Sequence, residues 1–246
     1  MRFKTALRLI AAFVSLAYAP AGYTAAPDEP GASGTIMPIS SPRLIRADFK
    51  REVPGKEARS IADWVVDSGD SARMPFAIVD KKAARVFVFD ARGELLGAAA
   101  VLLGIAIGDD SAPGVGALVL SAIRPQDRTT PAGRFEASLG RNYHGKRILW
   151  VDYDSAISMH PVINTVLSER RPYRLATPTP LDNRISFGCI NVPIPFFEDV
   201  VSRAFSGTNG IVYVLPEVRS LQAVFKAYAA ARPAAAHGAT GDTAKP

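Results

Sequence analysis

The stretch FAIVDKKAARVFVFDARGELLGAAAVLLG, residues 76–104, contains three short runs rich in Val, Leu, Phe and Ile. A pair of lysines separates the first run from the second, and an Ala-Arg-Gly turn separates the second from the third. Apolar runs this short, joined by connections of a few residues, are typical of antiparallel strands that follow one another in a meander. The stretch therefore predicts a mainly β fold.

More strands are expected toward the C-terminus. The candidates are GALVLSAI (116–123), residues 132–138, RILWVDY (147–153) and GIVYVL (210–215). Helical periodicity returns only at 195–205, where a proline stands near the start, and at 217–230. We therefore predict an α+β protein, mainly β with a few helices, whose main domain spans 72–216 and is followed by a C-terminal helix at 217–230.

The first 21 residues have the features of a secretory signal peptide. MRFKTALR is basic, LIAAFVSLAYA is apolar but too short to span a bilayer, and Ala19-Pro20-Ala21 is a small-x-small cleavage site. An uncleaved membrane anchor is the alternative. The signal peptide predicts that the protein is periplasmic and that, once residues 1–21 are removed, it is not stably inserted in a membrane.

The segments that flank the main domain differ from it in composition. Residues 22–43 are rich in Pro, Gly, Ala and Ser and lack an apolar period, which predicts a flexible leader. The same composition at 231–246 predicts a disordered tail. Between leader and domain, the extension at 44–71 contains RSIADWVVD (59–67), in which apolar residues recur at helical spacing and predict a short helix.

The net charge argues against one class of partner. The chain has 29 Lys and Arg against 23 Asp and Glu, and Arg2, Lys4 and Arg8 leave with the signal peptide, so 26 minus 23 gives +3 for the mature chain. A balance this small does not favour nucleic acid as a partner.

Cys189 is the only cysteine, and it lies in RISFGCINVP (184–193). A single cysteine cannot form an internal disulfide, so the core must stabilise the fold. In this stretch Gly188 permits a backbone conformation closed to other residues, and Ser186 and Asn191 can hydrogen-bond within a turn. Backbone N–H groups of such a turn are candidates for an oxyanion hole. Cys189 is then a reactive nucleophile, an intermolecular bridge or a buried inert thiol.

A nucleophilic cysteine needs a base or cation that holds it as thiolate. The chain has three histidines: His237 lies in the tail, His144 in the turn-like RNYHGK, and His160 at the end of a strand-like run. Asp152 and Asp154 share a strand face with His160, but an extended strand separates Asp154 from His160 by roughly 20 Å, which argues against a metal site.

Four segments resemble the catalytic domain family of L,D-transpeptidases, the YkuD type. SFGCIN resembles the Ser-His-Gly-Cys-apolar-Arg/Asn signature, TTPAGRF (129–135) the Thr-Pro-x-Gly-x-Phe segment, SMHPV (158–162) the stretch with the catalytic histidine, and residues 78–104 the opening hairpins. They occur in the family's order over much of 75–215. The resemblance implies a β-sandwich or barrel-like domain acting on peptidoglycan, with Cys189 as nucleophile, His160 as base, and no metal or organic cofactor.

The implied chemistry is acyl transfer on peptidoglycan stem peptides. Cys189 attacks the carbonyl before a terminal D-alanine, D-alanine leaves, and the amine of a second stem resolves the thioester. Backbone amides near Gly188 and Cys189 would stabilise the oxyanion, with Ser186 in the same turn. Resolution by water would make the protein an L,D-carboxypeptidase, and a degenerate member would bind peptidoglycan without turnover.

One arginine and one asparagine are candidates for substrate binding. Arg184 lies five residues before the nucleophile, and its planar guanidinium suits a stem carboxylate, with a structural ion pair as the alternative. Asn191 occupies the Arg/Asn position of the signature, where it binds substrate or holds the turn.

The chain departs from the family pattern in three places. Phe187 replaces the histidine of Ser-His-Gly-Cys, and Pro161 follows His160 where the family has Gly or Ser. His160 and Cys189 are 189 minus 160, or 29, residues apart, more than in most of the family. The additional residues, 164–184, are rich in Pro, Thr and Arg, and we expect them to form a lid over the cleft, in which Arg170 and Arg171 are either ligands or solvated.

Overall fold

A computed structural model describes residues 45–231. The predicted signal peptide, the leader and all but the first residue of the predicted tail lie outside this range. Within it, no helix is long and apolar enough to cross a membrane.

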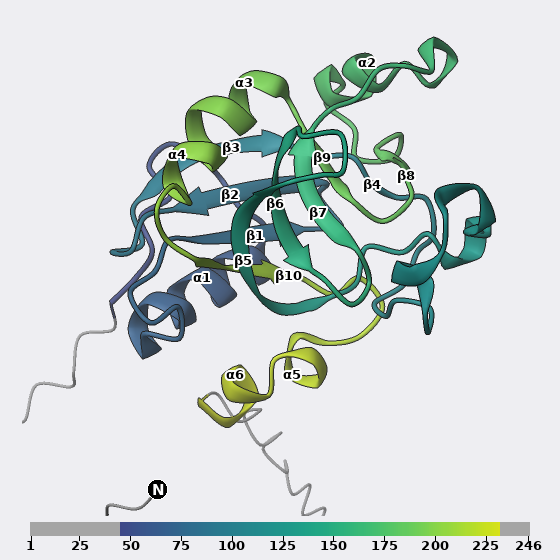
Figure 1. The fold of residues 1–246 in the computed structure, drawn as a ribbon. Coiled ribbons are helices and arrows are strands. Elements are labelled where there is room, and N and C mark those ends of the chain that lie inside the picture. The colour runs from purple at the N-terminus through teal and green to yellow at the C-terminus, as the bar shows by residue number, and fades with distance from the viewer. Residues whose placement is uncertain (1–44, 232–246) are drawn as a thin grey trace, which may run out of the picture. The chain divides into compact units, whose positions relative to one another are not determined.

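The described chain is mainly β with a few helices, as predicted (Figure 1). Its strands are β1 (Phe76–Asp80), β2 (Arg85–Phe89), β3 (Leu95–Ala100), β4 (Leu103–Gly104), β5 (Gly133–Arg141), β6 (Arg147–Asp152), β7 (Ile157–Pro161), β8 (Arg184–Ser186), β9 (Ile190–Val192) and β10 (Gly210–Val214). Eight of them form one sheet in the order β3-β2-β1-β10-β5-β6-β7-β9, and β4 pairs with β8 in a second, two-stranded sheet.

The large sheet is nearly closed. Leu102, just after the edge strand β3, exchanges two backbone hydrogen bonds of 2.8 and 2.9 Å with Asn191 in the other edge strand, β9. The two ends of the sheet are thereby joined, which covers the backbone groups that an open edge would expose. The barrel-like expectation agrees with this arrangement.

The central strand β1 is apolar on both faces because both faces are covered. Ala77 and Val79 pack into one core, whereas Phe76 and Ile78 pack into a second core on the opposite face. Successive side chains of this strand therefore pack into two different cores, and residues 76–79 include no polar residue.

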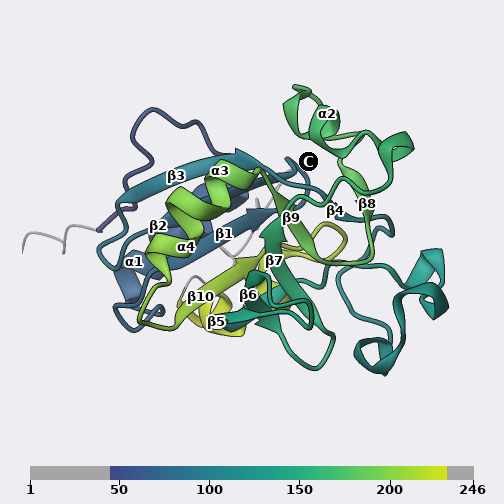
Figure 2. The ribbon, with the colours of Figure 1, turned by 45° about the horizontal axis from the view of Figure 1, so that its top comes forward.

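One helix, or one helical run, covers each of these faces. Helix α1 (Lys56–Ser68) packs its buried residues, among them Ile61 and Val65, into the second core, which confirms the helix expected at 59–67. The run α3 (Ile194–Phe196), η5 (Phe197–Val201, a π-helical turn) and α4 (Ser202–Ala204) covers the first core, as the pattern at 195–205 predicts (Figure 2).

The prediction of a strand at 116–123 is wrong. This segment forms two turns of 3-10 helix, η1 (Val115–Ala117) and η2 (Leu120–Ala122), and η3 (Pro125–Asp127) follows. A Cβ on Gly116 would lie 2.2 Å from the carbonyl oxygen of Asp154, so the chain presses its backbone against the β6–β7 connection. Its backbone N–H groups bond to carbonyls three residues earlier instead of joining a sheet.

The C-terminal helix expected at 217–230 is shorter and interrupted. Residues 217–220 are not helical, and the helix is divided into α5 (Leu221–Val224) and α6 (Lys226–Ala231) at Phe225. Phe225 has a non-helical backbone, and its side chain is buried in the second core. Burial of this ring has overridden the helical period of the sequence.

Candidate active site

Cys189 lies half-buried in the tight connection between β8 and β9. The preceding Gly188 has φ = +123°, and a Cβ there would lie 2.8 Å from both the Cδ1 atom of Ile157 and the carbonyl oxygen of Thr129. Only glycine combines this backbone conformation with so close an approach. The turn predicted from Gly188 is therefore present, and it presses the cysteine against β7.

Side-chain hydroxyls hold this turn. The Ser186 hydroxyl donates to the Cys189 carbonyl oxygen at 2.6 Å and accepts from the Gly188 N–H at 3.1 Å. The Gly188 N–H is thus engaged and is not a free oxyanion donor, which corrects the expectation for that amide. The Cys189 N–H has no hydrogen-bond partner within residues 45–231, so it is the available donor in the turn.

His160 comes to the thiol from the neighbouring strand. In the parallel pairing of β7 with β9, His160 lies opposite Asn191, two residues after the cysteine. The His160 Nδ1 atom is 2.8 Å from the Pro161 carbonyl oxygen. Because a carbonyl only accepts, Nδ1 carries the proton in the neutral ring and Nε2 is free to accept one from the thiol.

The thiol and the imidazole shift each other's protonation. Burial raises the pKa of Cys189, but the hydrogen bond and charge of His160, with further hydrogen bonds from Ser158, lower it below the usual value. Burial lowers the pKa of His160, but hydrogen bonding and charge from Cys189, together with the Pro161 carbonyl, raise it above the usual value. Both shifts favour a thiolate beside an imidazolium, the reactive form of a cysteine nucleophile.

Two cavities meet at Cys189 and Phe187. The smaller, of about 50 Å³, is lined mainly by apolar side chains, among them Val115, Leu118, Leu120 and Ile123. The larger, of about 330 Å³, is lined also by polar groups, among them His160, Glu169, Arg171 and Asn191. The thiol is therefore accessible from a cleft that is apolar on one side and polar on the other.

Phe187 packs where the signature of the resembling family has histidine. The Arg128 guanidinium lies 3.9 Å from the centre of the Phe187 ring, and its Nε donates to the Ile123 carbonyl at 3.0 Å. The aromatic ring therefore lines both cavities and binds an arginine through a cation–π contact. His160 lies in β7, so Phe187 does not alter the position of this histidine.

Arg184 is engaged elsewhere. Its guanidinium forms an ion pair with Glu217 and donates to the Lys81 carbonyl oxygen at 3.2 Å, and it does not line either cavity at Cys189. The geometry therefore gives no support to binding of a substrate carboxylate by Arg184. It fits the alternative, a structural ion pair.

Asn191 holds the turn and faces the cleft. Its Nδ2 atom donates to the Cys189 carbonyl oxygen at 3.2 Å and lies 3.5 Å from the His160 Nε2 atom. Its Oδ1 atom accepts from Arg171 at 2.8 Å. These three contacts place the amide between Cys189, His160 and the long connection between β7 and β8.

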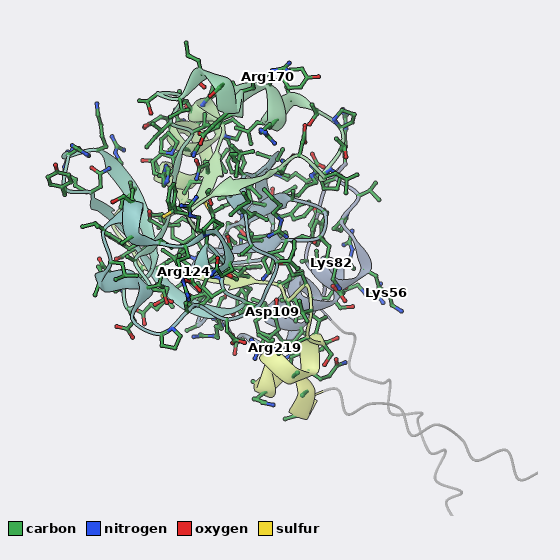
Figure 3. The ribbon with its side chains drawn as sticks, turned by 90° about the vertical axis from the view of Figure 1, so that its right-hand side faces the viewer. Lys56, Lys82, Asp109, Arg124, Arg170 and Arg219 are labelled. Atoms are coloured by element: carbon green, nitrogen blue, oxygen red, sulfur yellow. The ribbon has the colours of Figure 1, made fainter. Side chains whose placement is uncertain are left out.

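That connection forms a wall of the larger cavity. It contains η4 (Leu167–Glu169) and α2 (Arg171–Ala176), and Figure 2 shows it across β8 from the segment with η1 to η3. Its two adjacent arginines differ. Arg171 is largely buried and pairs with Glu169 at 2.5 Å. Arg170 is exposed, and its guanidinium lies over the Tyr173 ring at the outer side of the molecule (Figure 3).

Two buried residues behind the turn were not singled out from the sequence. The Thr130 hydroxyl donates to the Gly188 carbonyl oxygen at 2.7 Å, and the Lys81 ammonium donates to the Thr130 carbonyl oxygen at 3.0 Å. Thr130 belongs to TTPAGRF, so the motif was visible but its contact with the cysteine turn was not. Lys81 follows a strand in a charged turn, where exposure is the ordinary expectation.

In overall fold, the chain is similar to solved L,D-transpeptidases. An L,D-transpeptidase from Xylanimonas cellulosilytica is 12% identical over 58% of this chain and 60% of that chain, with a TM-score of 0.37. The catalytic domain from the E. faecium L,D-transpeptidase is 16% identical over 58% of this chain and 98% of that domain, with a TM-score of 0.32. The helical cell shape determining protein of Campylobacter jejuni is 16% identical over 60% of this chain and 49% of its own, with a TM-score of 0.37.

Likeness at this level concerns the fold alone. The matches cover 58% and 49% of the length of two further structures of this kind, one in complex with imipenem and one an avibactam carbamoyl enzyme. No protein-family model matches the chain, and no curated protein matches it.

Proposed function

We propose that the protein is a peptidoglycan L,D-transpeptidase that works through a thioester on Cys189. The observation that carries the proposal is the pairing of Cys189 with His160 at the point where two cavities meet, with mutual pKa shifts toward thiolate and imidazolium. Motifs of the YkuD type in the family's order support the choice of substrate, and the signal-like residues 1–21 support a periplasmic location.

In the first half-reaction a stem tetrapeptide acylates the enzyme. The Cys189 sulfur attacks the carbonyl that precedes the terminal D-alanine, and the Cys189 N–H stabilises the tetrahedral oxyanion. The carbon–nitrogen bond then breaks. His160 gives its proton to the departing nitrogen, so D-alanine leaves with a neutral amino group and a thioester remains.

In the second half-reaction an amine of another stem resolves the thioester. His160 accepts the proton of the attacking amine, a new amide bond forms, and the sulfur leaves as thiolate paired with imidazolium. The reaction needs no metal or organic cofactor. If water attacks instead, the same residues make the protein an L,D-carboxypeptidase.

Intact-mass measurement tests the first half-reaction. The purified protein is incubated with a disaccharide-tetrapeptide beside Cys189→Ala, and we expect an adduct equal to the stem without its terminal D-alanine, absent from the variant. Free D-alanine is measured in the same samples. If an active control enzyme works on this substrate while the protein gives neither adduct nor D-alanine, the protein is a degenerate member that binds peptidoglycan without turnover.

Product analysis then separates the two fates of the thioester. A cross-linked dimer of stems identifies transpeptidation, whereas a tripeptide stem alone identifies carboxypeptidation. Addition of a second, amine-bearing stem in excess provides the comparison, because it raises the yield of dimer only if the acceptor can enter the cleft.

A further inference from the structure

We propose that Thr130 is a positioning residue that orients the Cys189 N–H toward the oxyanion, and that the buried Lys81 holds Thr130 in place. The inference rests on the proposed function only in taking Cys189 as the nucleophile of an acyl transfer. It concerns a hydroxyl that lines neither of the two cavities at Cys189, so it assigns a role outside the catalytic pair.

The Thr130 hydroxyl joins two backbone segments in a fully buried place. It accepts from the Gly104 N–H in β4 at 2.9 Å and donates to the Gly188 carbonyl oxygen at 2.7 Å. Thr130 has 0% exposed surface, so no water competes for either bond. Loss of the hydroxyl would leave a buried donor and a buried acceptor without partners.

Orientation follows from the planarity of the peptide bond. The Gly188 carbonyl and the Cys189 N–H belong to one planar unit, and in a trans peptide they point in opposite directions. By drawing the carbonyl inward, Thr130 directs the N–H to the opposite side, where it has no partner within the described residues. Glycine permits a wider range of backbone rotation than other residue types, so the bond from Thr130 helps to fix the direction of this peptide unit.

Lys81 holds the backbone of Thr130. Its ammonium donates to the Thr130 carbonyl oxygen at 3.0 Å, to the Gly108 carbonyl oxygen at 2.5 Å and to Asp109 at 2.9 Å, and its side chain has 0% exposure. All three protons of the ammonium are thus used, one of them on the backbone of Thr130 itself. Thr130 is held through its backbone by Lys81 and holds Gly188 through its side chain.

Two electrophiles distinguish positioning from mere support of the fold. Iodoacetamide reacts with the thiolate by displacement and forms no oxyanion, so its rate reports the sulfur alone. With p-nitrophenyl acetate the sulfur attacks the ester carbonyl, an oxyanion forms, the carbon–oxygen bond breaks, and p-nitrophenolate leaves a thioester on Cys189. The ratio of acylation rate to alkylation rate therefore reports the oxyanion donor.

The test compares Thr130→Val, which removes the hydroxyl at nearly constant volume, with Thr130→Ser, which keeps it. We expect Thr130→Val to lower the ratio of acylation to alkylation about tenfold or more, because loss of one oxyanion donor costs about a hundredfold in acyl transfer. Thr130→Ser should restore most of the ratio. Val65→Ala, on the buried face of α1, serves as a destabilised control that should leave the ratio unchanged.

An unchanged ratio in Thr130→Val, or an equal fall of both rates, would overturn the inference. If Thr130→Val does not fold, Thr130→Ala, which also lacks the hydroxyl, is measured with the same expectation. Neither electrophile is a peptidoglycan fragment, so absence of a stem adduct in the wild type would contradict the proposed function and leave this test intact.

Discussion

At the scale of single residues, the pKa of Cys189 depends on the imidazole next to it. Burial by itself would raise the pKa of this thiol, and His160 reverses the shift through a hydrogen bond and its charge. The sulfur also lies 3.7 Å from the Ser158 hydroxyl, a weaker contact from the same strand. Removal of the imidazole should therefore leave an ordinary buried thiol.

His160→Ala should raise the pH midpoint of Cys189 alkylation and slow alkylation at neutral pH about tenfold or more, since only the thiolate reacts. The rate of iodoacetamide modification is followed by mass spectrometry across a pH series. His144→Ala, which removes the exposed histidine of the β5–β6 turn, is the matched control. Equal midpoints in both variants and the wild type would show that His160 does not activate the thiol.

A second residue-scale prediction concerns the glycine before the nucleophile. Gly188→Ala should destabilise the protein by roughly 3 kcal/mol, because φ = +123° is closed to alanine and the new Cβ would press on Ile157 and Thr129. Gly207→Ala, at φ = +72° with open space around it, should cost only about 1 kcal/mol. Urea unfolding measures both, and similar losses would contradict the close approach.

At the scale of elements, residues of the connection between β7 and β8 line the larger cavity and bond to residues of the site. Arg171 at the start of α2 bonds Asn191, which in turn contacts both His160 and the Cys189 carbonyl. The positive charge of Arg171 also opposes protonation of His160. The connection therefore influences the pKa of His160 directly.

Arg171→Met should raise the pKa of His160 further, because removal of a nearby positive charge favours the imidazolium. NMR titration of the His160 ring protons measures the shift. The neighbouring Arg170→Met removes an exposed charge that lies over Tyr173 and should leave the titration unchanged. A lowered pKa in Arg171→Met would mean that loss of the Asn191 contact outweighs the charge.

At the scale of the whole molecule, a buried charge cluster joins distant parts of the chain. Lys81 after β1, Asp109 in the connection before β5 and Glu217 after β10 have side chains with 0%, 2% and 6% exposure. Asp109 also accepts the backbone N–H groups of residues 217–219 at 2.6 to 3.0 Å. Figure 3 shows Asp109 close to Arg219 at the base of the C-terminal helices.

This cluster predicts loss of stability in acid. Burial raises the pKa of Asp109, but the backbone hydrogen bonds and Lys81 lower it to about 2, below the ordinary 3.8. A lowered pKa stabilises the fold above the unfolded value, and that contribution, roughly 2 kcal/mol, is lost as the pH falls from about 4 to about 2. Urea unfolding across this range should show a steeper pH dependence for the wild type than for Asp109→Asn, and equal slopes would contradict the assignment.

Local pattern determined much of this protein. Apolar alternation identified β1 to β3, helical spacing identified α1, and the Gly-Cys turn and the four motifs identified Cys189 and His160, because strands, helices and tight turns each require particular residues at particular spacing. The same reasoning predicted a strand at 116–123. There the backbone N–H groups bond to carbonyls three residues earlier, and Leu118, Val119 and Leu120 are exposed whereas Ile123 is buried.

Only the tertiary structure decided how the site is assembled. Parallel pairing of β7 with β9 brings His160 close to Cys189, which is 189 minus 160, or 29, residues away along the chain. In the folded chain Asn191 also bonds Arg171, and Gly188 bonds Thr130. The tertiary structure also pairs Arg184 with Glu217, and it buries the side chain of Lys81. Sequence spacing gives separations along the chain only. Which residues become neighbours depends on which strands pair, and which charges form ion pairs depends on which of them are buried away from water.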